Sequence, residues 1–267
     1  MNEAPHLLIF GLGYTAGRIA DAMRERGWQV SATGSKGDLD FADRQAVLAC
    51  LGRASHVLSS VPPDRRSGAD PVLGAYGDAL KEHWLGYLSS TGVYGDAGGA
   101  WVDESTPTVA ETGAGRRNAR AEADAAWLAL GARNFRLPGI YGPGRSALDR
   151  VRDGKARRID MPGQVFSRVH VDDIVSGVVA AFEREVPAGA YNLGDDLPAS
   201  GNAVTEEACR LRGQEPPPLE TLEEANLSEM ARGFYAENRR VANGKAKRVL
   251  GWAPQYATYK EGLASLS

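Results

Sequence analysis

Cysteine is scarce in this chain of 267 residues, and long hydrophobic runs are missing. The two cysteines, Cys50 and Cys209, lie far apart and form no Cys-x-x-Cys pair. This argues against a disulfide framework and against a zinc site, and it fits a reducing cytosol. No segment reaches about 18 apolar residues, and the N-terminal MNEAPH has no basic region before the apolar run. We therefore expect a cytoplasmic protein without a membrane span.

A strong excess of charge and a histidine cluster are also missing. The formal net charge is -3, with 24% charged and 43% hydrophobic residues, which is typical of a globular protein. General binding of nucleic acid or of an anionic membrane is therefore not expected. The four histidines are scattered without ligand spacing, so no metal site is predicted. The expected partner is a small-molecule substrate, and a homodimer is left open.

Two residue types are absent from the middle of the chain. No tyrosine occurs between Tyr94 and Tyr141, and no lysine occurs between Lys81 and Lys155. Any chemistry that needs a Tyr-x-x-x-Lys pair in this stretch is thereby excluded. A Tyr-x-x-x-Lys string does occur at residues 256–260, but it comes near the end of the chain and is interpreted as coincidence.

Short apolar runs alternate with helical stretches through the first half of the chain. Leu7–Phe10, Trp28–Thr33, His56–Ser60, Leu85–Ser89 and Asn134–Leu137 are predicted to be buried strands. Repeated strand-helix-strand units predict an α/β fold with a doubly wound parallel sheet of the Rossmann type.

The pattern becomes more polar after Pro138. We therefore predict a dinucleotide-binding domain at 1–138, to which 165–195 returns. A smaller, mainly C-terminal substrate lobe is expected from 196–267 together with 139–164. The cleft between the two parts is the expected site.

A glycine-rich turn follows the first predicted strand and opens a helix. Gly11, Gly13 and Ala16 match the pattern Gly-x-Gly-x-x-Ala. The first glycine permits the tight turn, the second lets the backbone approach a pyrophosphate, and the alanine permits close helix packing. The helix N-terminus adds N–H groups and a positive dipole end. With Tyr14 and Thr15, this turn is the predicted dinucleotide site.

The end of the second strand bears on the choice between NADP and NAD. An acid usually holds the ribose hydroxyls of NAD there, but this strand runs into Ser35 and Lys36. These two side chains are suited to a 2′-phosphate, so NADP is expected, with NAD possible. A solvated loop lysine is an equal alternative. Asp40 and Phe41 are predicted near the adenine, with a solvated Asp40 and a buried Phe41 as an equal alternative. Ser60 and Pro138 complete the predicted cofactor contacts.

Several blocks in order resemble the extended short-chain dehydrogenase/reductase family, which includes NAD-dependent epimerases and dehydratases. They are GLGYTAG, YLSSTGVYGD, WVDESTP, FRLPGIYGPG, RVHVDDIV and YNLGDD. The resemblance implies a Rossmann fold and an oxidoreductase or epimerase acting on a small polar or sugar-nucleotide-like substrate. It also implies that Ser90 hydrogen-bonds the reacting oxygen, with Thr91 beside it.

The resemblance breaks at the family's catalytic helix. Arg116 stands where the family has its tyrosine, and Arg120 stands where it has its lysine. Because an arginine stays protonated, it cannot relay a proton. The two arginines are assigned to substrate binding together with Arg145, although a solvated helix start is equally open. A basic patch follows the Tyr-Gly-Pro-Gly loop. It either contacts an anionic substrate or is a solvated surface, and its residues are Arg150, Arg152, Lys155, Arg157 and Arg158.

Two tyrosines in motif loops are the predicted substitutes for the missing donor. Tyr94 is the first choice and Tyr141 the second, because both follow strands at the edge where such sheets bind ligands. Two hypotheses therefore stand. The chain is an NAD(P)-dependent enzyme of atypical kind, or it is a catalytically silent dinucleotide-binding sensor or regulator.

Overall fold

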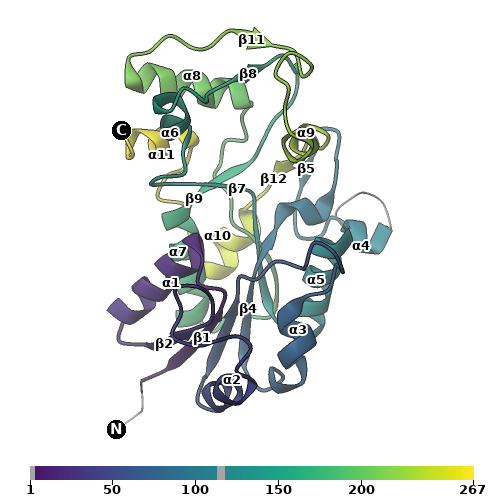
Figure 1. Ribbon diagram of the computed structural model, residues 1–267, viewed down its shortest axis with the longest axis vertical. Helices are drawn as coiled ribbons and strands as arrows, with labels where there is room; N and C mark the ends of the chain where they lie inside the picture. Colours follow the sequence, from purple (N-terminus) through teal and green to yellow (C-terminus); the bar gives the residue numbers. More distant parts are fainter. Residues whose placement is uncertain (1–3, 113–117) are drawn as a thin grey trace.

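The computed structural model describes residues 4–112 and 118–267. Its larger part is built on a six-stranded sheet in the order β10-β6-β4-β3-β1-β2, and every neighbouring pair is parallel (Figure 1). The predicted doubly wound α/β fold is confirmed. The strands of this sheet are β1 (His6–Phe10), β2 (Gln29–Ala32), β3 (His56–Ser59), β4 (Trp84–Ser90), β6 (Arg133–Leu137) and β10 (Gly189–Asn192).

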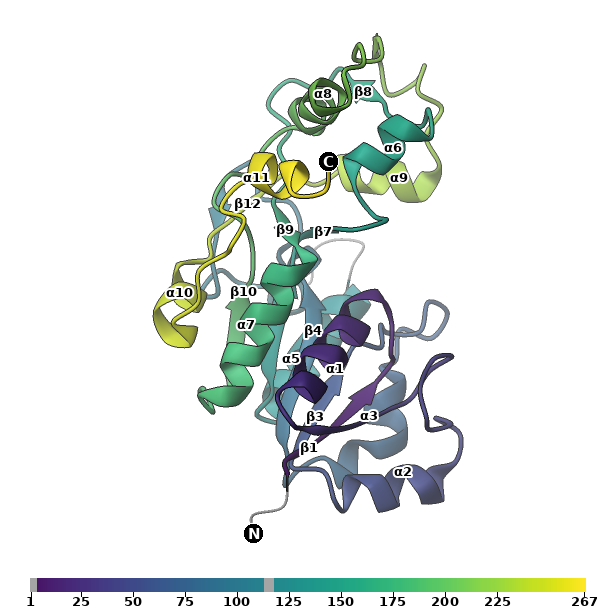
Figure 2. The ribbon, with the colours of Figure 1, turned by 90° about the vertical axis from the view of Figure 1, so that its left-hand side faces the viewer.

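Helices cover both faces of the sheet (Figure 2). One apolar cluster joins the sheet to α1 (Tyr14–Glu25) and α7 (Val171–Glu183). A second cluster lies on the opposite face, and its helices are α2 (Arg44–Leu51), α3 (Pro71–Tyr76) and α5 (Asn118–Ala129). All five residues of β1 are buried, because a parallel strand covered on both sides has no solvent face. The uninterrupted apolar runs of the sequence reflect this burial.

The strand order reverses at β1. The chain passes from β1 to β2 on one side and then crosses to β3 on the other. Right-handed crossovers of this kind leave a crevice at the carboxyl ends of the two strands where the order reverses. In this protein those ends are Gly11 and Ser60, so the topology itself places the glycine turn at a ligand-binding crevice.

A smaller lobe lies beyond the carboxyl edge of the sheet (Figure 1). Its own apolar cluster includes Leu148, Val204 and Leu263. The capping boxes Ser146–Asp149 and Thr258–Glu261 start two of its helices. The elements of the lobe are α6 (Ala147–Arg152), β8 (Arg158–Ile159), α8 (Gly201–Arg212), β11 (Leu219–Glu220), α9 (Glu229–Tyr235) and α11 (Tyr259–Ala264).

Short parallel ribbons connect the two parts. β7 (Gly139–Tyr141) pairs with β9 (Arg168–His170), and β5 (Trp101–Val102) pairs with β12 (Arg240–Val241). α10 (Gly244–Leu250) contacts α7 and β10, so the chain returns to the sheet within the stretch 196–267 that the sequence assigned to the lobe. The remaining short elements are η1 (Gly77–Ala79), η2 (Thr91–Tyr94) and α4 (Val109–Thr112). Within the described ranges, no helix has both the length and the apolar character to cross a membrane.

Candidate active site

The glycine turn joins β1 to α1 at the reversal of the strand order. Gly11 has φ +85°, and a Cβ there would lie 3.0 Å from Ser60 Oγ, so only glycine fits without strain. The Gly11 amide donates to Thr33 Oγ1 at 3.2 Å. Gly13 is the N-cap of α1, and no side chain caps the first amides of this helix. The helix N-terminus is therefore built to receive an anion such as a pyrophosphate.

Tyr14 links the glycine turn to the loop that enters the lobe. Its hydroxyl donates to the carbonyl of Pro143 at 3.1 Å. The guanidinium of Arg18 lies 4.1 Å from the centre of the ring, and that of Arg145 lies 5.7 Å away. Burial raises the pKa of the phenol, and the two arginines act against that rise. The contact fixes the loop that carries Arg145 over the start of α1.

A cleft of about 1240 Å³ runs from the glycine turn along the carboxyl edge of the sheet into the lobe. Both parts of the molecule line it, and the sequence predicts the site in a cleft of this kind. The predicted site residues along this cleft are Gly13, Tyr14, Thr15, Ala16, Ser60, Ser90, Thr91, Arg120, Pro138, Tyr141 and Arg145.

Five predicted cofactor residues lie outside the cleft lining: Gly11 in the turn itself, and four beyond the end of β2. Ser35 and Lys36 are exposed in the loop after Thr33. The Asp40 carboxylate accepts from the amide of Ala42 at 2.9 Å. The half-buried Phe41 ring meets Phe10 edge-on, with ring centres 6.1 Å apart. This surface adjoins the glycine turn, because the amide of Leu12 donates to the carbonyl of Thr33 at 2.8 Å.

Ser90 ends β4 and lines the cleft. Its hydroxyl oxygen accepts from the amide of Gly92 at 3.1 Å, which holds the side chain at the start of η2. Since the oxygen is the acceptor in that bond, the hydroxyl hydrogen remains for a substrate oxygen. Thr91 is next in the chain and is buried in the same wall.

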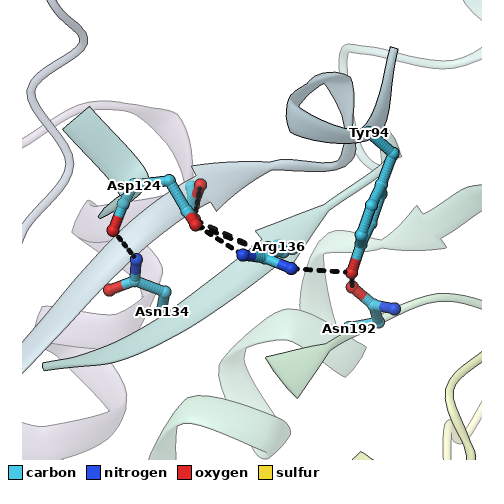
Figure 3. Close-up of polar contacts among 6 residues, drawn as sticks. Tyr94, Asp124, Asn134, Arg136 and Asn192 are labelled. Carbon is cyan, nitrogen blue, oxygen red and sulfur yellow. Dashed lines mark hydrogen bonds and ion pairs between the residues drawn. The ribbon is translucent and has the colours of Figure 1, made fainter. Parts of the chain in front are cut away.

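A buried polar network joins Asp124, Arg136, Tyr94 and Asn192 (Figure 3). Asp124 of α5 and Arg136 of β6 form an ion pair, with Oδ2 and Nη2 at 2.6 Å and side chains 1% and 4% exposed. Ser89 Oγ donates to Asp124 Oδ1 at 2.5 Å, so β4 is part of the same network. Burial opposes the charge of Arg136, but the hydrogen bonds and the charge of Asp124 outweigh it and raise the pKa of the guanidinium. The pair fixes three elements around the Ser90 strand end.

The network continues to Tyr94, the first predicted proton donor. Arg136 Nη1 donates to the Tyr94 hydroxyl at 3.0 Å, and that hydroxyl donates to Asn192 Oδ1 at 2.8 Å. Burial raises the pKa of Tyr94, which lies outside the cleft lining. A hydroxyl whose hydrogen is held by Asn192 on the inner side of the wall is poorly placed to protonate a substrate. This placement does not favour the role predicted for Tyr94.

Tyr141, the second predicted donor, lines the cleft but turns its hydroxyl into the protein. A Cβ at Gly262 would lie 1.9 Å from that oxygen, so the phenol sits against the backbone of α11. Its ring meets His170 edge-on at 5.1 Å. Burial raises the pKa of Tyr141, and the charges of Asp195 and Asp173 add to the rise. Tyr141 therefore stays protonated and packs the junction with the lobe.

Arg120 is the described member of the predicted arginine pair, because Arg116 lies outside the described residues. It is half-buried on α5 and lines the cleft with Ser90. Its charge acts on the buried phenol of Tyr87, lowering a pKa that burial raises. Arg120, which stands where the short-chain dehydrogenase/reductase family has its lysine, thus places a permanent positive charge in the cleft wall.

Sequence reasoning missed the ion pair Asp124–Arg136. A signal was present, because Arg136 interrupts an apolar strand and Asp124 interrupts an alanine-rich helix. Charged residues inside such segments are rarely buried unless they are paired. Within residues 4–112 and 118–267, no group of three or more metal-ligating side chains is arranged to hold a metal ion.

The comparisons with known proteins agree with this architecture. A functionally unknown conserved protein from Silicibacter pomeroyi has 40% sequence identity and a TM-score of 0.85, with 98% of each chain covered. The chain belongs to the family of this protein. Protein YeeZ of Escherichia coli is 28% identical over 93% of this chain and 95% of its own. A 3-diazoavenalumate denitrifying reductase from Streptomyces is 34% identical over 46% of this chain and 43% of its own. No protein-family model matches the chain.

More distant solved structures share the fold. The dTDP-glucose 4,6-dehydratase of Bacillus anthracis in complex with NAD has a TM-score of 0.75 at 17% identity and covers 98% of this chain and 95% of its own. The human epimerase family protein SDR39U1 with NADPH has a TM-score of 0.76 at 14% identity and covers 97% and 98%. The fold is thus that of NAD(P)-binding epimerases and dehydratases.

Replacing Gly13 tests whether the turn holds a cofactor. A Cβ at Gly13 meets nothing within 4 Å, so Gly13→Val should lower the free energy of unfolding by no more than about 1 kcal/mol. The new side chain would stand where a pyrophosphate must approach, and calorimetry should show NADPH affinity reduced at least about tenfold. Gly17→Val, also in open space but outside the cleft lining, is the matched control and should leave affinity unchanged. If the unaltered protein, Gly13→Val and Gly17→Val bound NADPH with equal affinity, the cofactor site would lie elsewhere.

Arg136→Met tests the buried network. It leaves the Asp124 carboxylate buried without its partner, so urea unfolding should show a loss of about 3–5 kcal/mol. Arg152→Met, which breaks exposed pairs with Asp149 and Asp153, should cost less than about 1 kcal/mol. Equal small losses for both variants would show that the network does not hold the strand ends.

Proposed function

We propose that this protein is an NAD(P)-dependent oxidoreductase that acts on a small-molecule substrate. The observation that carries the proposal is the single cleft that connects the Gly13 turn, the Ser90 strand end and the lobe. A dinucleotide with its pyrophosphate at α1 would extend along the carboxyl edge of the sheet toward Ser90. The substrate would then enter from the lobe side and meet the nicotinamide at Ser90.

The residues present fit such a cofactor. The open space at Gly13 accepts a backbone-to-phosphate approach, and Ser60 and Pro138 border the same cleft. The bound nicotinamide would supply or accept the hydride. Ser90 would donate its hydrogen to the substrate oxygen and hold it in place. Arg120 would contribute a permanent positive charge that stabilises developing negative charge on that oxygen.

The loss of the family's tyrosine and lysine sets a limit on this chemistry. Arginine cannot exchange a proton near neutral pH, and the hydroxyls of Tyr94 and Tyr141 are held within the protein. None of these side chains is therefore placed to supply the proton, and we propose that it reaches the substrate through Ser90 or from water. The same observation favours the alternative function, a silent NADP(H)-binding sensor, in which the cleft binds the dinucleotide without turnover.

A substrate panel, followed by the variant Ser90→Ala, separates the enzyme from the silent sensor. NADPH oxidation should first be followed with a panel of carbonyl and sugar-nucleotide substrates. For any substrate that is turned over, Ser90→Ala should lower kcat about a hundredfold with unchanged NADPH affinity, because one donor to the reacting oxygen is lost. Ser90→Thr keeps the hydroxyl and should recover part of the rate. If NADPH binds and no member of the panel is reduced, the sensor is the better description.

For the cofactor, we propose NADP in preference to NAD. Ser35 and Lys36 follow β2 at the place where an NAD-binding protein usually has an acid, and both side chains are exposed. The nearby Asp38 carboxylate accepts from the amide of Ala32 at 2.6 Å, so it is engaged along the sheet edge. The arrangement suits a 2′-phosphate better than a pair of ribose hydroxyls.

Lys36→Ala should weaken NADP binding about tenfold, which is the loss expected for one charge-assisted contact. NAD affinity, measured by the same calorimetry, should stay unchanged because NAD lacks the 2′-phosphate. Tighter binding of NAD than of NADP by the unaltered protein would contradict this cofactor assignment.

A further inference from the structure

The lobe half of the cleft offers few groups that could read the hydroxyls of a sugar. Its described lining contains no asparagine, glutamine or histidine. The hydroxyls of Ser146 and Thr205 donate within the protein, whereas that of Ser167 accepts and keeps its hydrogen for a ligand. Ser146 donates to Asp149 at 2.7 Å, Ser167 accepts from the amide of Val241 at 2.9 Å, and Thr205 donates to the carbonyl of Arg157 at 3.2 Å. A sugar bound here would meet no side-chain amide and few free aliphatic hydroxyls, which are the neutral groups that pair with its own hydroxyls.

The acids of this half are engaged as well. Asp149 accepts from Ser146 and pairs with Arg152, whose guanidinium also meets Asp153 at 3.0 Å. Glu237 pairs with Arg239 at 2.7 Å, with side chains 16% and 14% exposed. The lining that remains for a ligand is therefore cationic and apolar.

Two cations and two aromatic rings form one corner of this half, which we call the aromatic corner: Arg150, Phe166, Arg168 and Tyr235. The rings of Phe166 and Tyr235 meet edge-on at 5.6 Å. The guanidinium of Arg168 lies 5.8 Å from the centre of the Phe166 ring. All four residues line the cleft.

Arg150 lines the same cleft, and its charge acts on both Arg168 and Tyr235. Burial lowers the pKa of Arg168 to about 10; Asp195 acts against that change, and the charge of Arg150 adds to it. Burial raises the pKa of the Tyr235 hydroxyl, while Arg150 and Arg168 both act to lower it. Two like charges thus act on each other across the cleft wall. An anion between them would relieve their repulsion.

Apolar walls surround this corner. Val204 and Leu263 come from the lobe core, and Leu227 and Phe234 come from the segment around α9. The Phe234 side chain is 53% exposed although it lines the cleft. A large apolar surface beside a charged corner in a cavity is typical of a pocket for an amphipathic small molecule.

We propose that the lobe half of the cleft binds an aryl carboxylic acid, with the carboxylate between Arg150 and Arg168 and the ring against Phe166 and Tyr235. A single negative charge matches this corner, because Arg168 already donates to the carbonyls of Phe166, Ala199 and Ser200 at 2.8, 2.9 and 3.4 Å. The N–H donors that remain on Arg168 are too few to pair with all the oxygens of a dianionic phosphate. The assignment deepens the proposed function by naming the substrate class of the same site.

The test is equilibrium binding to the protein with NADPH present. The probes are benzoate, phenylacetate and 4-hydroxycinnamate, with 4-hydroxycinnamate methyl ester as the uncharged match and UDP-glucose and inorganic phosphate as competitors. At least one acid should bind, and 4-hydroxycinnamate should bind about tenfold tighter than its ester, as expected for one charge-assisted pair. Arg150→Met should remove this preference for the acid. Arg150→Lys should keep part of it, and Arg212→Met on the outer part of α8 should keep all of it.

Three results would overturn the assignment: no acid binds below about 1 mM, UDP-glucose or phosphate binds tighter than every acid, or Arg150→Met leaves the preference unchanged. NADPH binding is measured first in the same samples. Loss of NADPH binding would count against the proposed function itself. NADPH binding without acid binding would count against the substrate class alone.

Discussion

The buried ion pair between Asp124 and Arg136 is the interaction on which the position of the site depends. It joins α5 to β6, and through Ser89 it also holds β4. Two charges removed from water stabilise a fold only when they are fully paired, so the three elements are tied to one geometry. Ser90 follows Ser89 on β4, and Arg120 lies one helical turn before Asp124 on α5. The cleft wall is thus built from residues adjacent to the pair.

The two neighbouring serines at the end of β4 have different roles. Both serines border the cleft. The Ser89 hydroxyl donates to the ion pair, whereas the Ser90 hydroxyl accepts from the Gly92 amide, because successive side chains of a strand point to opposite faces. Tyr94 completes the inward network through Asn192. The Tyr94 hydroxyl is therefore used to hold the wall, and both Ser90 and the positively charged Arg120 line the cleft.

The sequence predicted the parts of the structure that depend on local patterns. Apolar runs identified the strands, and the spacing of Gly11, Gly13 and Ala16 placed the turn at the crevice. The orientation of Tyr94 and Tyr141 was not predictable, because it depends on Asn192 and Gly262, about a hundred residues away in the chain. The aromatic corner was missed for the same reason. It joins Arg150 and Arg168 to Phe166 and Tyr235, from separate elements, and only the fold brings them together.

We propose that one cleft holds a dinucleotide at Gly13 and presents its nicotinamide end at Ser90. A crystal structure of the protein with NADPH is the decisive experiment. We expect the pyrophosphate against the first amides of α1 and the nicotinamide ring beside the Ser90 hydroxyl, with the lobe half of the cleft left open for a second ligand. A cofactor bound outside this cleft, or a nicotinamide ring directed away from Ser90, would contradict it.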